Sequence, residues 1–138
     1  MSLTTKMLRT VERRIPKVID ARAHGALDYL HAGFFLGLAW YLRRRQPRAA
    51  VAAAATGSFL LAQSLLTDYP LGASKIIPFS IHGQMDTAFA AASMRLPKIF
   101  GFEGTAASKI FKGNSAVEGA VIGLTDWSNE RARLGKVA

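Results

Sequence analysis

The sequence predicts an all-α protein, a four-helix membrane bundle made of two tandem helical hairpins with an amphipathic helix in front. Two observations carry this prediction. A short phrase, His-Gly-x-x-Asp, occurs at residues 24–28 and again 58 positions later at residues 82–86. The stretches that follow each copy are long and rich in Ala, Gly and Leu. Because the same offset relates Thr67-Asp68 to Thr125-Asp126, we interpret the chain as a tandem repeat.

The repeat defines the expected organisation of the 138 residues. A chain of this length corresponds to one domain. Each unit has the pattern of a helical hairpin, so both units begin and end on the same side, as in a parallel repeat. The expected segments are a basic amphipathic segment at 1–22, a duplicated four-helix membrane domain at 23–127 with repeat units 17–69 and 75–127, and a polar tail at 128–138.

Composition narrows the classes of partner. The chain has no cysteine, which excludes disulfide and thiolate chemistry. The formal net charge is +9, and no nucleic-acid-binding motif accompanies it, so we expect no nucleic acid as a partner. We expect the basic residues between the first two apolar runs to contact the anionic headgroups of a lipid bilayer. These residues are Arg43, Arg44, Arg45 and Arg48.

The first hairpin is expected to follow the basic segment. Residues 1–22 carry apolar side chains at near-helical spacing between Lys and Arg, which is typical of a helix lying in the membrane interface and ending near Pro16. Residues 24–42 are apolar, and a helix of this length spans about 28 Å, near the thickness of the hydrocarbon core. Trp40 and Tyr41 end this stretch beside the Arg-rich loop, and residues 49–67 form the returning helix.

The second hairpin is expected to contain helices at 79–96 and at about 106–125. Pro97 ends the first of these helices. The last helix is the most polar of the four, so it is either shielded by the other helices or only partly embedded, and a soluble four-helix bundle remains an alternative. The polar residues that interrupt it are Lys109, Lys112, Asn114 and Glu118.

The parallel repeat places both His-Gly-x-x-Asp phrases at the same end of the molecule. His24 and Asp28 lie four residues apart and share a helix face, and so do His82 and Asp86. His31 extends the first of these stripes by one turn. We therefore predict a polar layer at one end of the bundle. The other residues expected in this layer are Gly25, Gly83, Thr67, Asp68, Thr125 and Asp126.

Three interpretations of the polar layer are open. It can be a hydrogen-bonded lock that fixes helix register. It can be a ligand site, in which the two imidazoles and two carboxylates of residues 24, 82, 28 and 86 bind a divalent metal such as Zn, Mn or Fe, or the two imidazoles hold a haem from both faces. It can also be the site of a small transporter or proton relay. No nucleophile elbow, phosphate loop or zincin helix occurs in the sequence, so we predict no enzyme.

Several phrases of the chain resemble the small bacterial membrane proteins with SPW repeats. The similarity rests on the two His-Gly-x-x-Asp phrases, on residues 64–72 (Ser-Leu-Leu-Thr-Asp-Tyr-Pro-Leu-Gly) and on Ile77-Pro78 before the second His. It covers about residues 22–127. Residues 96–102 stand where that family carries its Ser-Pro-Trp phrase. The resemblance implies a four-span protein, multi-pass in the bacterial inner membrane.

Together these observations lead us to expect a non-catalytic accessory or scaffold subunit of a membrane assembly. Its expected partners are the lipid bilayer and other membrane-protein subunits or a second copy of the chain. A haem- or metal-binding membrane protein that uses the duplicated His/Asp pairs is the alternative, and a small transporter or proton relay is the second alternative.

Overall fold

The computed structural model describes residues 15–128, and over these residues the protein is all-α. The four long helices form at the expected places, with ends that shift by a few residues. The helices are α2 (Ala21–Leu42), α3 (Pro47–Leu66), α4 (Phe79–Ser93), the short α5 (Leu96–Ile99) and α6 (Ala106–Leu124). Two short strands, β1 (Thr67–Asp68) and β2 (Ile77–Pro78), pair in parallel.

Two predictions about helix boundaries need correction. The helix expected at 79–96 ends at Ser93, and Pro97 lies in the first turn of α5, where its missing N–H costs no hydrogen bond. Residues 15–20 are not helical, and α2 begins at Ala21, so the last two residues of the expected 1–22 segment belong to α2. Residues 1–14, with most of the expected interfacial helix, lie outside the described residues, and so do residues 129–138 of the expected tail.

Local chemistry explains where the helices begin. The Asp20 carboxylate accepts hydrogen bonds from the backbone N–H groups of Arg22 and Ala23, at 3.0 and 2.8 Å, and so caps α2. Thr105 caps α6 in the same way, because its hydroxyl oxygen accepts from the Ser108 N–H at 3.2 Å. α3 starts with a proline, which is pre-organised for the first helical position.

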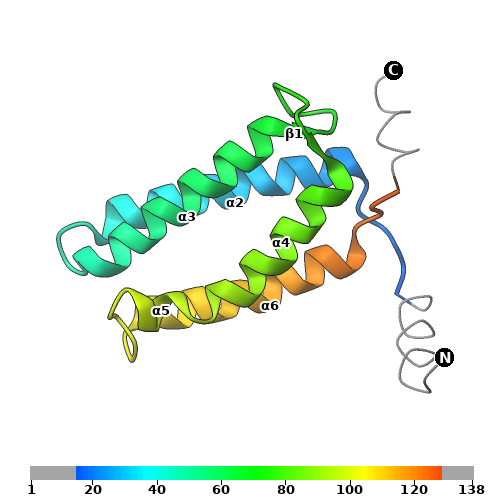
Figure 1. Ribbon diagram of the computed structural model, residues 1–138. Coiled ribbons are helices and arrows are strands. Elements are labelled where there is room, and N and C mark those ends of the chain that lie inside the picture. Colours follow the sequence, from blue (N-terminus) through cyan, green and yellow to red (C-terminus); the bar gives the residue numbers. More distant parts are fainter. Residues whose placement is uncertain (1–14, 129–138) are drawn as a thin grey trace.

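The helices pack in two pairs, α2 with α3 and α4 with α6 (Figure 1). In the first pair, Gly57 allows close contact: a Cβ there would lie 2.8 Å from the Leu36 side chain and 3.0 Å from the Ala32 carbonyl oxygen. Small and aromatic side chains fill the space among the helices. This core consists of Ala32, Phe35, Leu42, Ala49, Ala50, Ala52, Ala53, Leu60, Phe102, Ala107 and Phe111.

One end of the molecule gathers the start of α2, the end of α3, the start of α4 and the end of α6 (Figure 1). Backbone pairing ties this end together. Thr67 pairs with Ile77 in the β1–β2 ladder, and Ile19 forms a parallel bridge to Thr125. The two pairings are related by the offset of the sequence repeat, since Ile19 and Ile77, like Thr67 and Thr125, lie 58 residues apart.

Candidate metal centre

The end described above holds a cluster of two imidazoles and two carboxylates. His24 and Asp28 come from the first turns of α2, and His82 and Asp86 come from those of α4. Each residue offers one ligand atom, and these four atoms lie within 4.8 Å of one another. All four side chains are largely buried, with 1% of each imidazole, 12% of the Asp28 side chain and 4% of the Asp86 side chain exposed. Among the described residues, this is the one such group of His and acidic side chains.

Three of the ligand atoms form a nearly equilateral triangle. The His24 Nε2 and His82 Nε2 atoms are 3.3 Å apart. One oxygen, Asp86 Oδ2, lies 3.1 Å from the His24 nitrogen and 3.2 Å from the His82 nitrogen. Asp28 occupies the fourth corner, with Oδ1 at 3.4 Å from His24 Nε2 and Oδ2 at 3.2 Å from His82 Nε2. Asp28 therefore contacts the two imidazoles through different oxygens, and nearly equal edges are a property of the three-atom triangle, while all four ligand atoms lie within 4.8 Å of one another.

Two threonine hydroxyls determine that the Nδ1 atom of each imidazole carries a proton. His24 Nδ1 lies 2.9 Å from the Thr125 hydroxyl, and His82 Nδ1 lies 2.7 Å from the Thr67 hydroxyl. Each hydroxyl donates its only proton to the backbone carbonyl four residues earlier, at 2.7 Å for Thr67 and 2.6 Å for Thr125. Each hydroxyl must therefore accept a hydrogen bond from the Nδ1–H of the imidazole. In the neutral imidazole, this leaves the lone pair on Nε2, which faces the centre of the cluster.

The carboxylates also have outer partners. The Tyr69 hydroxyl donates to Asp28 Oδ2 at 3.1 Å, and the Gln63 amide donates to Asp86 Oδ1 at 2.6 Å. Every member of the cluster thus has a polar partner that orients it, which is the usual outer shell of a metal site. Tyr69 and Gln63 were not predicted from the sequence. Gln63 is a single amide in an apolar helix, and Val121 stands at its position in the second unit.

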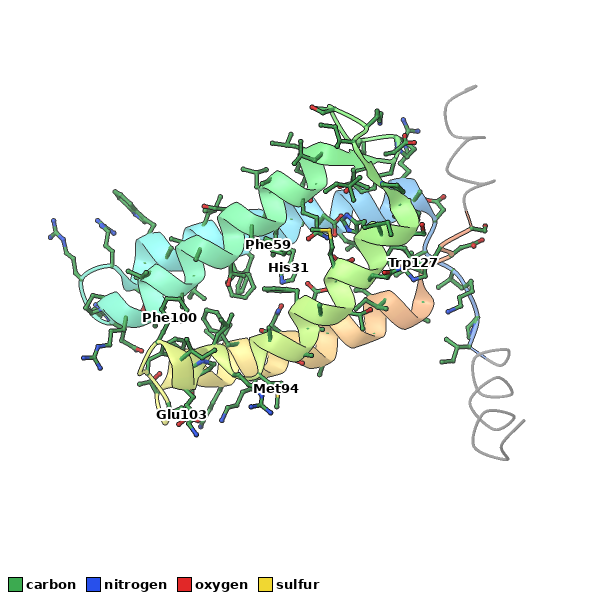
Figure 2. All side chains as sticks on the ribbon, in the orientation of Figure 1. His31, Phe59, Met94, Phe100, Glu103 and Trp127 are labelled. Atoms are coloured by element: carbon green, nitrogen blue, oxygen red, sulfur yellow. The ribbon has the colours of Figure 1, made fainter. Side chains whose placement is uncertain are left out.

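Aromatic rings cover the cluster at the end of the molecule. Phe79 and Trp127 pack edge-on against His24, with ring centroids 5.6 and 4.8 Å away, and Figure 2 shows Trp127 at this end. Gly25 and Gly83 make room for the cover. A Cβ on Gly25 would lie 2.7 Å from the Tyr69 ring, and a Cβ on Gly83 would lie 2.9 Å from the Trp127 ring. The cover therefore seals the cluster from this direction.

Of the remaining residues predicted for the polar layer, the two threonines lie at the cluster and the two aspartates lie outside it. Thr67 and Thr125 are fully buried beside the imidazoles. Asp68 lies in β1, Asp126 follows the bridge at Thr125, and both are half-buried; neither belongs to the four-residue cluster. The basic residues of the α2–α3 turn lie near the opposite end of α2, where Arg43 stacks on the Trp40 ring at 3.5 Å.

A second polar group lies deeper among the helices, where Figure 2 shows His31 between the two helix pairs. His31 Nδ1 lies 2.8 Å from Glu118 Oε1, and its Nε2 lies 2.5 Å from Asn114 Oδ1. From the sequence, Asn114 and Glu118 are predicted only to be polar interruptions of the last helix. The structure shows that they point inward and join α6 to α2.

Comparison of the chain with protein-family models, with curated proteins and with solved structures gave no match.

Proposed function

We propose that the protein binds one divalent metal ion between His24, His82, Asp28 and Asp86, and that this ion holds the two helix pairs together. The triangle of His24 Nε2, His82 Nε2 and Asp86 Oδ2 carries the proposal. A tetrahedral ion with bonds of about 2.0 Å separates its ligand atoms by about 3.3 Å. The three edges of the triangle are 3.3, 3.1 and 3.2 Å, which fits such an ion at the centre.

The alternative to an ion is a purely hydrogen-bonded lock. With both imidazoles neutral and protonated on Nδ1, the four atoms that face the centre are all acceptors, so an added proton or a metal cation has to join them. A single proton on His82 Nε2 would leave two acceptors, His24 Nε2 and Asp86 Oδ2, 3.1 Å apart. Protons on both Nε2 atoms would place two positive imidazolium nitrogens 3.3 Å apart in a buried site. Like charges at this distance repel strongly in a low dielectric. A single dication balances the two carboxylates and leaves both imidazoles neutral, which favours metal over protons.

The donor set indicates the kind of metal. Two imidazole nitrogens and two carboxylates, without any thiolate, suit Zn²⁺ and also Mn²⁺ or Fe²⁺. Four protein ligands in a buried position are typical of a structural rather than a catalytic site. A haem suits the arrangement less well than a single ion. Axial nitrogens on opposite sides of one iron would be about 4 Å apart, from two bonds of about 2 Å, and the two carboxylates stand where the macrocycle would lie.

We further propose that the protein is a multi-pass membrane protein, a four-helix bundle that arose by duplication of a hairpin and is related to the SPW-repeat proteins. One helix among residues 15–128, α3, is long and apolar enough to span a membrane by length and composition. The outer surface supports more than one span, because large apolar side chains such as Leu30, Phe34 and Val117 are exposed on α2 and α6. Arg43 and Arg45 pack on Trp40 and Tyr41, as expected beside anionic headgroups.

In this proposal the metal is structural, and the protein serves as a non-catalytic accessory or scaffold subunit. A rigid bundle with a sealed ion presents its apolar outer faces to lipid and to partner subunits. A co-purification experiment from native membranes tests the subunit role. A chain that is monodisperse and monomeric, with no partner of defined stoichiometry, would count against it.

The metal is tested by elemental analysis of the full chain, purified in detergent without a metal-chelating tag and then incubated with Zn²⁺, Mn²⁺ or Fe²⁺. We expect one ion per chain for the natural protein and for His31→Phe, and less than a tenth of that for a His24→Ala/His82→Ala double variant. The His31→Phe control removes an imidazole outside the cluster. Substitution with Co²⁺ should give the visible absorption of a tetrahedral site. Equal metal content in the natural protein and the double variant would refute the metal centre.

A further inference from the structure

A groove between α2 and α6 lies beside the metal centre. Its volume is about 470 Å³, within the range of small-molecule sites. Its walls are apolar and include Leu30, Phe34 and Val117, and its polar lining comes from Asp28, His31, Asn114 and Glu118. Among these residues, Asp28 also belongs to the four-residue cluster, and it is the more exposed of the two carboxylates there.

A second groove between α3 and α4 serves as an internal comparison. Its volume is about 430 Å³, and Figure 2 shows Phe59 and Phe100, two of its lining residues. Positions 58 residues apart line the two grooves: Leu27 matches Met85 and Val117 matches Phe59. The polar positions differ. His31 corresponds to Phe89, Asn114 to Thr56 and Glu118 to the buried Leu60. The two grooves are therefore similar in size and equivalent in position, but the α2–α6 groove has a larger polar part in its lining than the α3–α4 groove has.

Hydrogen bonds define what the polar lining offers. Ser93 donates its hydroxyl proton to the Phe111 carbonyl oxygen at 3.0 Å, so it accepts from the Asn114 amide N–H at 3.4 Å. The Asn114 amide oxygen then faces His31 Nε2, while His31 Nδ1 faces the Glu118 carboxylate. Both ring nitrogens of His31 must donate, and both are occupied. Glu118 Oε1 faces His31, and both Asp28 oxygens face the imidazoles of the cluster or Tyr69. What remains for a ligand is the other oxygen of Glu118, which accepts hydrogen bonds and does not donate them.

We propose that the α2–α6 groove binds a single-chain amphiphile whose head group donates hydrogen bonds, either a long-chain alcohol or a long-chain ammonium. The hydrocarbon chain lies along the apolar walls, and the head group donates to the Glu118 carboxylate with Asp28 nearby. Burying polar side chains in an apolar groove is costly unless they gain partners. A donor head group supplies such a partner to the Glu118 oxygen that does not face His31. The proposal depends on the groove residues and does not require the metal.

Photolabelling of the full chain in detergent micelles tests the proposal. The probes are dodecanol, dodecylamine and dodecanoate analogues that carry a diazirine near the head, and labelled peptides are located by mass spectrometry. We expect the alcohol or the amine to label α2 and α6 about tenfold more than α3 and α4, since a hydrogen bond to a charged group favours one groove by this factor. Dodecanoate, which is anionic and accepts, should label both grooves equally. The difference between the alcohol and amine arms tells which head group is bound.

Matched variants distinguish binding in the groove from general contact of the probe with the protein surface in the micelle. A Gly113→Leu substitution fills the α2–α6 groove, because a Cβ there meets no neighbouring atom within 4 Å. Ala55→Leu places the same side chain at the equivalent position of the other groove. We expect Gly113→Leu to abolish the preferential labelling and Ala55→Leu to leave it intact. A Glu118→Leu variant, which introduces the residue of the equivalent position, should equalise labelling by the three probes.

Equal labelling of both grooves, or a preference that does not depend on the head group, would overturn the proposal and indicate only contact with detergent or lipid. Metal analysis of the same samples keeps the two proposals apart. Preferential labelling without bound metal would refute the metal centre alone. One ion per chain without preferential labelling would refute the amphiphile site alone.

Discussion

A single hydroxyl proton determines the chemistry of each imidazole in the cluster. Because Thr67 and Thr125 donate to backbone carbonyls, they can only accept from the imidazoles, and this aims both Nε2 lone pairs at the centre. An asparagine or a backbone N–H at the same place would permit the opposite tautomer. In the proposed metal centre, the threonines thus orient both imidazoles for a cation before it binds.

Replacing these hydroxyls is expected to weaken metal binding without removing a ligand. Thr67→Val and Thr125→Val should each lower the affinity for Zn²⁺ by about 10- to 100-fold, the usual effect of losing an outer-shell partner of a metal ligand. The measurement is competition with a chromophoric chelator. Thr87→Val is the matched control, because the Thr87 hydroxyl makes the same type of bond, to the Gly83 carbonyl oxygen at 2.8 Å. Equal loss of affinity in all three variants would show that the hydroxyls act through helix stability.

At the scale of a helix, α2 carries glycines in two different environments. Gly25 lies against the Tyr69 ring, which covers the cluster and donates to Asp28. Gly33 lies on the same helix with no atom within 4 Å of an added Cβ. The first position requires glycine for close approach, while the second only reduces helix propensity.

Alanine substitutions in α2 should therefore have opposite effects. Gly25→Ala forces the Tyr69 ring aside and should destabilise the protein by about 1–3 kcal/mol. Gly33→Ala should stabilise it by up to about 1 kcal/mol, the difference in helix propensity between the two residues. Reversible unfolding in mixed micelles measures both. A neutral or stabilising Gly25→Ala would mean that Tyr69 is not held in place.

The sequence predicts the long helices well, because apolar stretches and their proline or capped starts mark them clearly. It predicts the short elements poorly. The two-residue strands β1 and β2 depend on contacts between the ends of different helices, which a local pattern does not contain. The direction of the polar side chains of α6 was likewise not predictable from a local pattern, because Asn114 and Glu118 turn inward to His31 while Lys109 and Lys112 are exposed.

For the whole molecule, the proposed ion connects two helix pairs that meet at this end mainly through polar groups and a small aromatic cluster. Binding of an ion to the folded state alone adds stability according to the ion concentration. The contribution is about 2.7 kcal/mol when the free ion is at 100 times its dissociation constant. Metal removal should therefore lower the midpoint of thermal unfolding.

The test compares unfolding with saturating Zn²⁺ and with excess chelator. We expect a fall of several degrees in the natural protein, about 4–8 °C for each 2 kcal/mol in a chain of this size. The His24→Ala/His82→Ala variant should show the same midpoint in both conditions. A chelator effect that persists in that variant would place the ion elsewhere in the protein.

The convergence of His24, Asp28, His82 and Asp86 is what the predicted tandem repeat leads one to expect, because a parallel pair of hairpins would bring equivalent positions together. The partners of these residues could not be predicted in the same way. Tyr69 and Gln63 contact Asp28 and Asp86 through contacts that break the symmetry of the two units. The repeat likewise does not reveal which threonine orients which imidazole, since both choices preserve the pattern.

In the structure, each imidazole of the cluster bonds a threonine from the other half of the chain. The imidazole of residue 24 bonds the threonine that ends α6, and the imidazole of residue 82 bonds the threonine that ends α3. Neither half of the chain therefore contains both an imidazole of the cluster and the threonine hydroxyl that orients it. Two separately expressed halves of the present chain should, for the same reason, recover the centre only by complementation.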